Sequence, residues 1–339
     1  MRIGVIGCGY WGAKHVRVLS SLPQVSQVVA IDRNRAATAA LQASFPALQV
    51  AADVGEALPM IDAAVVATPP RGHAPVALEL LRAGKHVLVE KPMATSVADA
   101  EEMIRVAGER GLTRMAGHTF EYNAAVRALR QSLVDGELGR VHYIDTARLN
   151  LGLYQSDVNV VWDLAPHDIS IVNYLLGSEP ASVSTWGLPH AQARLEDVAY
   201  LSLRYPDVEA MAHIHVSWLD PCKVRRVTVV GDKRMAVYND LADEGRIKVY
   251  DKGVALPEPL ADGGPPMSYR YGGIYAPYIE LEEPLRVENE HFLACIETGT
   301  EPLSGGASGL SVVRVLEGAQ ESLRTGRPVE LLSTVGGLR

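Results

Sequence analysis

The stretch RIGVIGCGYWG, residues 2–12, joins a short β-branched run to the start of a helical pattern. Its first five residues have the length and the apolar character of a buried strand. Three glycines follow, and a tight turn or a close approach between strand and helix favours a residue without a Cβ atom. The stretch therefore predicts a strand, a sharp turn and a helix, the opening unit of a fold that alternates strands and helices.

The same alternation continues to about residue 120. Six short apolar runs alternate with longer helical patterns; the runs are RIGVIG, QVVAID, LQVAAD, AAVVAT, HVLVEK and LTRMAGH. One of the helical patterns, SVADAEEMIRVAGERG, opens at Ser96, a residue type that caps helices. Continuous apolar strands are typical of a parallel sheet that helices cover on both faces. Residues 1–120 are therefore predicted to form a Rossmann-type, doubly wound α/β domain that binds a dinucleotide.

The pattern changes after a helix that we expect at about 122–135. Strands then follow one another, in RVHYIDTARLN, ASVSTWGL, DVAYLSLRY, VEAMAHIHVSW, RRVTVVG and RMAVYND, and a Gly-Asp pair at 231–232 predicts a hairpin between the last two. One helix is expected near APHDISIVNYLLG, followed after the strands by a loop at 253–283 and helices at about 284–298 and 307–325. Residues 121–339 are thus predicted to form an α+β domain with an open, mostly antiparallel sheet, which binds substrate and carries the oligomer contact.

The composition excludes several classes of protein. The 339 residues carry a net charge of -8 with acidic and basic residues interspersed, so we expect no nucleic-acid partner. No stretch approaches the roughly 18 consecutive apolar residues of a membrane span, and glycines interrupt the N-terminal apolar run, unlike a signal peptide. Three cysteines without a CxxC pair favour a reducing compartment. We therefore expect a soluble, cytoplasmic protein without a membrane partner.

The glycine spacing also predicts a binding site. Gly7, Gly9 and Gly12 form a GxGxxG pattern between the first strand and the first helix. Gly7 would allow the tight turn, Gly9 would let the backbone approach a pyrophosphate, and Gly12 would let helix and strand pack closely. The N–H groups at the start of the helix, at Tyr10 and Trp11, would then bind the anion. A glycine-rich turn in an α/β fold that binds no nucleotide is the alternative.

The residue that ends the second strand selects between nicotinamide cofactors. Asp32 stands at the interval expected for an acidic residue that accepts hydrogen bonds from the adenosine ribose and repels a 2′-phosphate. This favours NAD over NADP. Arg33 and Arg35 follow, and an arginine at this place can hold the 2′-phosphate, so NADP stays open as a second cofactor.

The segment ATPPRGH, residues 67–73, follows the fourth strand at the carboxyl edge of the predicted sheet, where ligands of this fold bind. Thr68 and Pro69 are expected to line the nicotinamide side of the cofactor site. His73 would begin the next helix as a further cofactor contact. An ordinary turn between a strand and a helix explains the same segment equally well.

A lysine stands at the end of the fifth strand, in LVEKPMA, residues 88–94. Desolvating a charged amine at the tip of a buried strand is costly, so Lys91 calls for a reason. Pro92 ends the strand ladder and fixes the backbone, which would aim the amine. A lysine held there can donate to a hydroxyl oxygen as charge develops on it, or relay its proton. The alternative is a solvent-facing lysine at a strand end.

The chain resembles the Gfo/Idh/MocA family of NAD(P)-dependent sugar and polyol oxidoreductases over nearly its whole length. The resemblance rests on GVIGCGYWGAKH, VATPPRGHAPVALELLRAGKHVLVEKPMA, GHTFEYNAAV and WDLAPHDISIVNYLLG. It implies that Glu-Lys-Pro closes the fifth strand and places Lys91 between nicotinamide and substrate, beside Glu90. It also implies that an acid that positions a sugar hydroxyl and a histidine that accepts a proton enter from the second domain. Those roles fall on Asp163 and His167.

The segment WDLAPHD, residues 162–168, contains both of these residues. Asp163 and His167 are four apart and would share one face of a helix, and Pro166 would fit in the first turn of that helix. Histidine suits proton transfer because its ordinary pKa is near neutral pH. The alternative has Asp163 as the helix N-cap and His167 as a core residue. The segment also departs from the commoner GG…D.G.H entry of the family, which bears on the substrate more than on the chemistry.

Further polar residues are candidates for substrate contact. They precede the helix entry or follow HTFEY, and they are Asn123, Arg148, Asn150, Tyr154, Asp157 and Asn159. Loop capping and turn formation are the alternative role for each. The two imidazoles of HIH at 213–215 have no third ligand at a plausible spacing, so we expect no metal site.

These residues together predict an NAD-dependent dehydrogenase that acts on a secondary hydroxyl of a sugar, nucleotide sugar or cyclitol, or that reduces the corresponding ketone. Lys91 and His167 would manage the proton, and Asp163 would orient the ring. A sugar-sensing regulator on the same fold and a hydride-shuttling oxidoreductase that retains its cofactor are the alternatives. The exposed sheet of the second domain predicts a homodimer or homotetramer.

Overall fold

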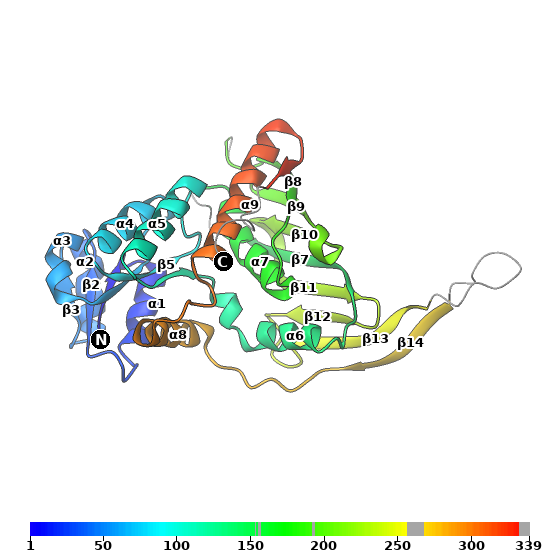
Figure 1. Ribbon diagram of the computed structural model, residues 1–339, viewed down its shortest axis with the longest axis horizontal. Helices are drawn as coiled ribbons and strands as arrows, with labels where there is room; N and C mark the ends of the chain where they lie inside the picture. Colours follow the sequence, from blue (N-terminus) through cyan, green and yellow to red (C-terminus); the bar gives the residue numbers. More distant parts are fainter. Residues whose placement is uncertain (153, 155–156, 192–193, 256–267, 332–339) are drawn as a thin grey trace, which may run out of the picture. The chain divides into compact units, whose positions relative to one another are not determined.

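The computed structural model describes residues 1–152, 154, 157–191, 194–255 and 268–331 of the chain. These residues divide into two compact units (Figure 1). The first unit contains Met1–Tyr122 and Glu282–Glu317, and the second contains Asn123–Leu281 and the residues from Gly318 onward. The prediction placed everything after residue 120 in one second domain, whereas residues 282–317 return to the first unit.

The first unit is built on a sheet of six parallel strands in the order β3-β2-β1-β4-β5-β6. The strands are β1 (Arg2–Ile6), β2 (Gln27–Ile31), β3 (Gln49–Ala51), β4 (Ala63–Val66), β5 (His86–Glu90) and β6 (Arg114–Gly117). This order is that of a dinucleotide-binding Rossmann sheet, in which the strand order reverses beside β1 and β4. The predicted doubly wound fold is confirmed.

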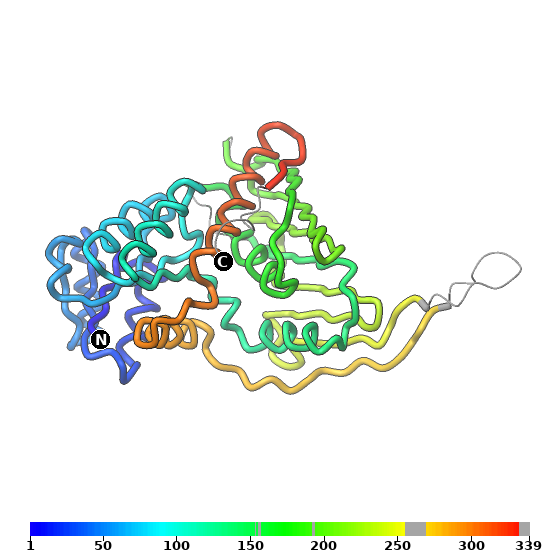
Figure 2. Tube along the Cα trace, viewed as in Figure 1, coloured from blue at the N-terminus to red at the C-terminus, as the bar shows by residue number. Residues whose placement is uncertain are grey.

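Helices cover both faces of this sheet because neighbouring residues of each strand point to opposite faces. On β5, Val87 and Val89 pack into one core, and Leu88 packs into the other. The helices α4 (His73–Arg82) and α5 (Val97–Glu109) contribute to the first core, and α1 (Tyr10–Leu19) and α8 (Pro284–Thr298) to the second. Figure 2 shows α8, in orange, beside α1, in blue. The late helix α8 therefore completes the first unit.

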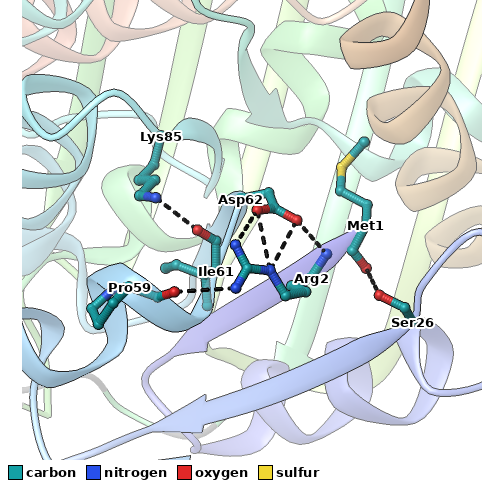
Figure 3. Close-up of polar contacts among 7 residues, drawn as sticks. All are labelled: Met1, Arg2, Ser26, Pro59, Ile61, Asp62 and Lys85. Carbon is teal, nitrogen blue, oxygen red and sulfur yellow. Dashed lines mark hydrogen bonds and ion pairs between the residues drawn. The ribbon is translucent and has the colours of Figure 1, made fainter.

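The amino edge of the same sheet is closed by contacts within the protein (Figure 3). The Arg2 guanidinium donates to Asp62, which precedes β4, at 2.6 Å between Nη2 and Oδ1. Lys85, which precedes β5, donates from Nζ to the carbonyl oxygen of Ile61 at 2.7 Å. These charged groups are thus bound by other groups of the protein, and the opposite, carboxyl edge carries the candidate site.

The second unit is built on a sheet of nine strands in the order β14-β13-β12-β11-β7-β10-β9-β8-β15. Every pairing is antiparallel except the one between β7 and β10, so the predicted open, mostly antiparallel sheet is confirmed. The strands are β7 (Val141–Leu151), β8 (Ser182–Leu188), β9 (Val198–Tyr205), β10 (Ala210–Ser217), β11 (Leu219–Gly231), β12 (Met235–Asn239), β13 (Ile247–Ala255), β14 (Ser268–Tyr275) and β15 (Val329–Glu330). The helices α6 (Ala124–Val134) and α7 (Val160–Leu176) belong to this unit.

Two expectations about local structure are corrected. The helix expected near residue 165 begins at Val160, because the Asn159 side chain accepts a hydrogen bond from the Trp162 N–H and caps it there. Pro166 therefore lies inside the helix and not in its first turn. Ser268–Tyr275, expected within a loop, forms strand β14 against β13, because its aromatic residues suit a strand despite the glycines.

Among the helices that the structure describes, none combines the length and the apolar character needed to cross a membrane.

Two glutamates are buried in the first unit between the short helix Thr119–Tyr122 and the helices α8 and α9 (Gly306–Thr325). Glu121 accepts a hydrogen bond from the Ser308 hydroxyl at 3.2 Å, and burial raises its pKa to about 8. Glu288 accepts one from the Thr119 hydroxyl at 3.0 Å. Burial, together with the negative charge of Glu90, raises the pKa of Glu288 well above its usual range. Both side chains are therefore protonated in the folded protein at neutral pH.

This burial predicts a dependence of stability on pH. The pKa of Glu121 is about 8 in the folded protein and near 4.5 for an ordinary glutamate, so the folded state binds more protons between these two values. The free energy of unfolding should therefore fall as the pH rises from about 5 to 8, by up to about 1.4 kcal/mol per pH unit for each such group. Glu121→Gln should flatten this slope in urea titrations at several pH values.

The exposed residue Glu79 of α4 provides a control, because Glu79→Gln removes a carboxyl of the same type from the surface of the same unit. Its slope should equal that of the unmodified protein. An unchanged slope in Glu121→Gln would show that Glu121 is ionised in the folded protein.

Candidate active site

The glycine-rich turn between β1 and α1 has the geometry expected of a pyrophosphate cradle. Gly7 has a φ of +91°, and a Cβ atom there would lie 2.7 Å from the carbonyl oxygen of Ala67. A Cβ atom at Gly12 would lie 1.8 Å from the carbonyl oxygen of Gly7, so helix and turn pack too closely for any other residue. By contrast, a Cβ atom at Gly9 would meet no atom within 4 Å. The backbone at Gly9 is therefore open to an approaching ligand, which fits a dinucleotide.

The start of α1 adds positive charge to this cradle. Gly9 is the N-cap, and no side-chain cap bond is found there in the part of the chain that the structure describes. The ammonium group of Lys14 lies 4.3 Å from the ring centroid of Tyr10 and 4.7 Å from that of Trp11. Tyr10 is exposed beside it. The helix N-terminus and Lys14 together suit an anion, and Lys14 is a residue that the motif alone did not reveal.

Asp32 braces the same turn from the end of β2. Its Oδ2 accepts a hydrogen bond from the Cys8 N–H at 2.7 Å, and its Oδ1 accepts one from the Asn34 N–H at 2.8 Å. The carboxylate is half-buried, whereas Arg33 and Arg35 are exposed. Asp32 is thus held beside the glycine turn, at the place where the fold binds an adenosine ribose.

His73, which was predicted to contact the cofactor, lies in the interior of the first unit. The side chain is 1% exposed, with Nε2 2.7 Å from the carbonyl oxygen of Thr68 and Nδ1 2.8 Å from that of Pro92. Burial lowers the pKa of His73, although the two carbonyl oxygens oppose this. His73 therefore ties the segment after β4 to the segment after β5. Pro69 is exposed on the first of these segments, and the Thr68 hydroxyl has no partner among the described residues.

The lysine at the end of β5 is half-buried, and its peptide bond to Pro92 is cis. The preceding Glu90 is 5% exposed, so it lies behind the edge and not on the ligand surface. Its Oε1 is 3.0 Å from Nε2 of His15 on α1, and its Oε2 accepts from the Lys91 N–H at 3.2 Å. Asn289 of α8 lies on the other side of the imidazole, with its Oδ1 3.3 Å from Nδ1.

These contacts keep Glu90 ionised. Burial by itself raises the pKa of Glu90, but the hydrogen bond from His15 and the nearby positive charge of Lys91 help to outweigh it, and the pKa falls below its usual value. A buried carboxylate needs such partners to be stable. The buried pair of Glu90 and His15 therefore fixes the backbone from which the Lys91 side chain extends. His15 ends the motif GVIGCGYWGAKH, but only the fold shows its partner.

His118 stands beside Lys91 at the carboxyl edge. It follows β6, and the register pairs Glu90 with Gly117, so Lys91 and His118 are the next residues on adjacent strands. His118 is 1% exposed, and neither ring nitrogen has a hydrogen-bond partner among the residues described. Burial lowers its pKa to about 4, with Glu90 opposing and Lys91 adding to the shift. The ring is therefore neutral at neutral pH.

In the second unit, Asp163 and His167 lie in α7 and are both half-buried. Their spacing of four places them on one face of the helix. The Asp163 carboxylate accepts a hydrogen bond from the indole N–H of Trp218, at 3.1 Å to Oδ2. Since Asn159 caps the helix, Asp163 is not needed as its N-cap.

Two predicted substrate contacts have structural roles in this unit. Arg148 is buried on β7 and donates from Nε to Oδ2 of Asp168 at 2.6 Å. Asn123 is buried and caps α6, accepting hydrogen bonds from the Ala125 and Val126 N–H groups. Arg148 was predicted from the polar segment before the helix entry, and Asn123 from its place after HTFEY. A polar residue in such a segment serves equally well as a cap or as an ion-pair partner.

The remaining candidates, apart from the helix cap Asn159, are half-buried. Asn150 lies near the end of β7, and Tyr154 follows with its ring centroid 5.2 Å from that of Trp218. Of the two imidazoles on β10, His213 contacts the Ser202 hydroxyl and His215 stacks on Tyr200. No group of three metal-ligating side chains occurs within the described ranges.

The bracing of Asp32 generates a prediction about cofactor choice. Asp32→Asn keeps an oxygen that can accept from the Cys8 N–H but removes the negative charge that repels a 2′-phosphate. The ratio of NADP affinity to NAD affinity, from fluorescence titrations, should rise roughly tenfold or more, in the range of a lost or gained charged contact. Arg33→Ala is the control and should weaken NADP more than NAD. A ratio unchanged by Asp32→Asn would remove Asp32 from cofactor selection.

Two family models match most of the chain. The model of an oxidoreductase family with an NAD-binding Rossmann fold matches residues 1–118. The model of a GFO/IDH/MocA C-terminal domain matches residues 126–237. The first match contains the glycine turn and Lys91, and the second contains α7 and Trp218.

Individual relatives agree with this. The chain is 33% identical over 52% of its length to a 4-carboxy-2-hydroxymuconate-6-semialdehyde dehydrogenase of Sphingobium sp.. It is 32% identical over 56% of its length to a UDP-N-acetylglucosamine 3-dehydrogenase of Acidithiobacillus ferrooxidans. These matches span 59% and 58% of the two relatives. Inositol 2-dehydrogenase of Rhizobium meliloti is 24% identical over 98% of this chain and 99% of that protein.

A solved structure extends the likeness to both units. The crystallised Acidithiobacillus ferrooxidans enzyme superposes with a TM-score of 0.81 at 25% identity, covering 95% of this chain and 97% of the other. The first family model thus covers the glycine turn and Lys91, and the second covers Asp163 and His167 of α7. The chain belongs to the Gfo/Idh/MocA family of NAD-binding oxidoreductases.

Proposed function

We propose that this protein is an NAD-dependent dehydrogenase that oxidises a secondary hydroxyl of a sugar, nucleotide sugar or cyclitol, or reduces the corresponding ketone. The first unit is the dinucleotide-binding domain, and the second is the substrate domain. The proposal is supported above all by one observation. Lys91 stands at the carboxyl edge of the Rossmann sheet on a backbone that the buried pair of Glu90 and His15 holds in place.

The residues of the first unit suit NAD. The backbone at Gly9 and the N-terminus of α1 would hold the pyrophosphate, Asp32 the adenosine ribose, and Thr68 and Pro69 the nicotinamide side. NAD supplies the acceptor for the hydride when it is bound. The chain itself supplies the amine of Lys91, which would donate to the substrate oxygen and so stabilise the charge that develops there.

The second unit would supply the groups that recognise the substrate. His167 would accept the proton that the hydroxyl loses, because a histidine ordinarily titrates near neutral pH. Asp163 would accept a hydrogen bond from a neighbouring hydroxyl and so orient the ring. A compound with adjacent hydroxyls fits this pair better than a simple alcohol, which supports a polyhydroxylated substrate. The dehydrogenases of UDP-N-acetylglucosamine and inositol named above are consistent with that class.

Substitution of Lys91 tests the central role. Lys91→Ala should bind NAD with an affinity within about threefold of the unmodified protein and should lose a factor of roughly 100 or more in kcat, as expected for a lost proton-transfer or charge-stabilising group. NADH absorbance with a panel of sugars, nucleotide sugars and cyclitols would give kcat, and fluorescence titration would give the affinity.

Lys85 offers a matched control, because it is the lysine that precedes the same strand at the opposite edge of the sheet. Lys85→Ala should leave kcat unchanged. Near-normal kcat in Lys91→Ala would remove Lys91 from the mechanism. NAD binding without turnover of any compound by the unmodified protein would instead indicate a regulator on this fold.

We also propose that the protein acts in the cytoplasm as a homodimer or homotetramer, assembled through the second sheet. One face of that sheet exposes a row of large side chains on four adjacent strands, at Tyr143, Trp186, Tyr200 and Met211. An exposed apolar patch of this kind is typical of a protein interface.

Light scattering tests this assembly. The protein should have at least twice the mass of the 36.6 kDa chain, and Tyr200→Glu with Trp186→Glu should dissociate it, because burying two unpaired carboxylates costs several kcal/mol. A monomeric mass for the unmodified protein at micromolar concentration would refute the proposal.

A further inference from the structure

Trp218 stands at a crossing point of the second unit. It lies between β10 and β11, and these two strands flank β7 on its two sides, so the chain crosses the end of β7 at this residue. β7 ends at Leu151, and the residues that follow lead to α7. Trp218 is 1% exposed, although it belongs to neither strand.

The backbone of Trp218 is fixed on both sides. Its N–H donates to the carbonyl oxygen of Asp197 at 2.9 Å, and its carbonyl oxygen accepts from the Gly152 N–H at 3.0 Å. A Cβ atom at Gly152 would lie 2.9 Å from Cδ1 of the indole, so the ring lies directly against the chain there. The Asp197 side chain is itself buried and accepts hydrogen bonds from the His190 and Ala191 N–H groups. The indole ring therefore has little freedom to turn.

The polar edge of this fixed ring reaches the candidate site. The indole N–H donates to Oδ2 of Asp163 at 3.1 Å, and the ring of Tyr154 lies tilted against the indole, with 5.2 Å between centroids. An indole has one donor and no acceptor, so its hydrogen bond sets the plane of the carboxylate without competing for a ligand's donors. The Asp163 side chain is half-buried, in contrast to Trp218 behind it.

We propose that Trp218 is a positioning residue that fixes the Asp163 carboxylate, and with it the hydroxyl of the substrate that this carboxylate accepts. The inference rests on the proposed function, because it gives Asp163 its substrate. Since Asp163 would hold the same hydroxyl in the ground state and the transition state, the indole contributes to binding more than to the chemical step. Trp218 thereby favours compounds that carry a second hydroxyl next to the reacting one.

The first experiment measures steady-state kinetics with the sugar, nucleotide sugar or cyclitol that is turned over best. Trp218→Phe keeps an aromatic ring near Tyr154 and removes the N–H together with part of the indole ring, so KM should rise roughly 10-fold or more, as expected for a lost hydrogen bond to a charged group, while kcat changes less than about twofold. Tyr278→Phe is the control, because Tyr278 is 92% exposed and has no place in this network or in the proposed subunit interface. Its KM should not change.

A double-mutant cycle identifies Asp163 as the partner. Asp163→Asn alone should raise KM, and adding Trp218→Phe to it should raise KM by less than twofold more, because the contact is already impaired. Unchanged KM in Trp218→Phe, a loss confined to kcat, or independent effects in the double variant would overturn the inference.

The second experiment does not depend on activity. The chain has four tryptophans, so a ¹H–¹⁵N spectrum should contain four indole signals. The signal that disappears in Trp218→Phe should lie downfield of the other three, because its N–H donates to a carboxylate. In Asp163→Asn the acceptor is uncharged, so this signal should move upfield. If Trp218→Phe does not fold, the indole signal is assigned from its nuclear Overhauser contacts with the Tyr154 ring, which lies against the indole, and is then followed in Asp163→Asn. An indole signal that Asp163→Asn does not move would overturn the inference, whereas absence of turnover by the unmodified protein would overturn the proposed function and leave this measurement intact.

Discussion

The first unit depends on one buried hydrogen-bonded pair. Glu90 at the end of β5 meets His15 of α1, and Asn289 of α8 orients the far side of the imidazole. The three side chains come from segments far apart in the sequence, and each would be costly to bury alone. Together they fix the last residue of the strand from which Lys91 extends. His73 ties Pro92, the residue that follows Lys91, to the neighbouring loop. The backbone on both sides of Lys91 is thus held in place. A catalytic group needs such support, because it must keep a fixed position relative to the reacting atom.

The two edges of the Rossmann sheet show how position determines chemistry. At the amino edge Arg2 pairs with Asp62, and Lys85 binds a backbone carbonyl. At the carboxyl edge the backbone at Gly9 is open, and His118 has two ring nitrogens without a partner among the described residues. A parallel sheet brings all its carboxyl ends to one edge, so residues from several strands can meet there. The second unit uses a comparable device, in which the buried ring of Trp218 holds the half-buried carboxylate of Asp163.

Much of this fold could be predicted from local patterns. Apolar runs of strand length and the glycines between them predicted the parallel sheet, and the spacing of Asp163 and His167 predicted a shared helix face. The start of α7 could not be predicted correctly. Pro166 suggested a first turn near residue 165, whereas the residue that caps the helix is Asn159, which looks like the other polar residues of its segment. Strand β14 was missed because glycines break its pattern, and its pairing with β13 comes from the fold.

The site was predicted less completely than the fold, for a physical reason. A polar residue near a strand end can bind a ligand, cap a helix or pair with a buried charge, and Asn123 and Arg148 have the latter two roles. His15, His118 and Trp218 were not singled out, because their roles depend on partners 55 to 75 residues away or on a neighbouring strand. Residues whose role follows from the local chain, such as the glycines of the turn, could be predicted. Residues whose role depends on tertiary contacts could not.

The proposed mechanism depends most on where the amine of Lys91 lies when ligands are bound. A crystal structure of the complex with NAD and a substrate that the protein oxidises would measure this directly. We expect Nζ of Lys91 within hydrogen-bond distance, roughly 2.7–3.2 Å, of the reacting substrate oxygen, with the nicotinamide ring beside it and the imidazole of His167 reaching the same oxygen. A structure in which this amine faces bulk water, away from the nicotinamide, would contradict it.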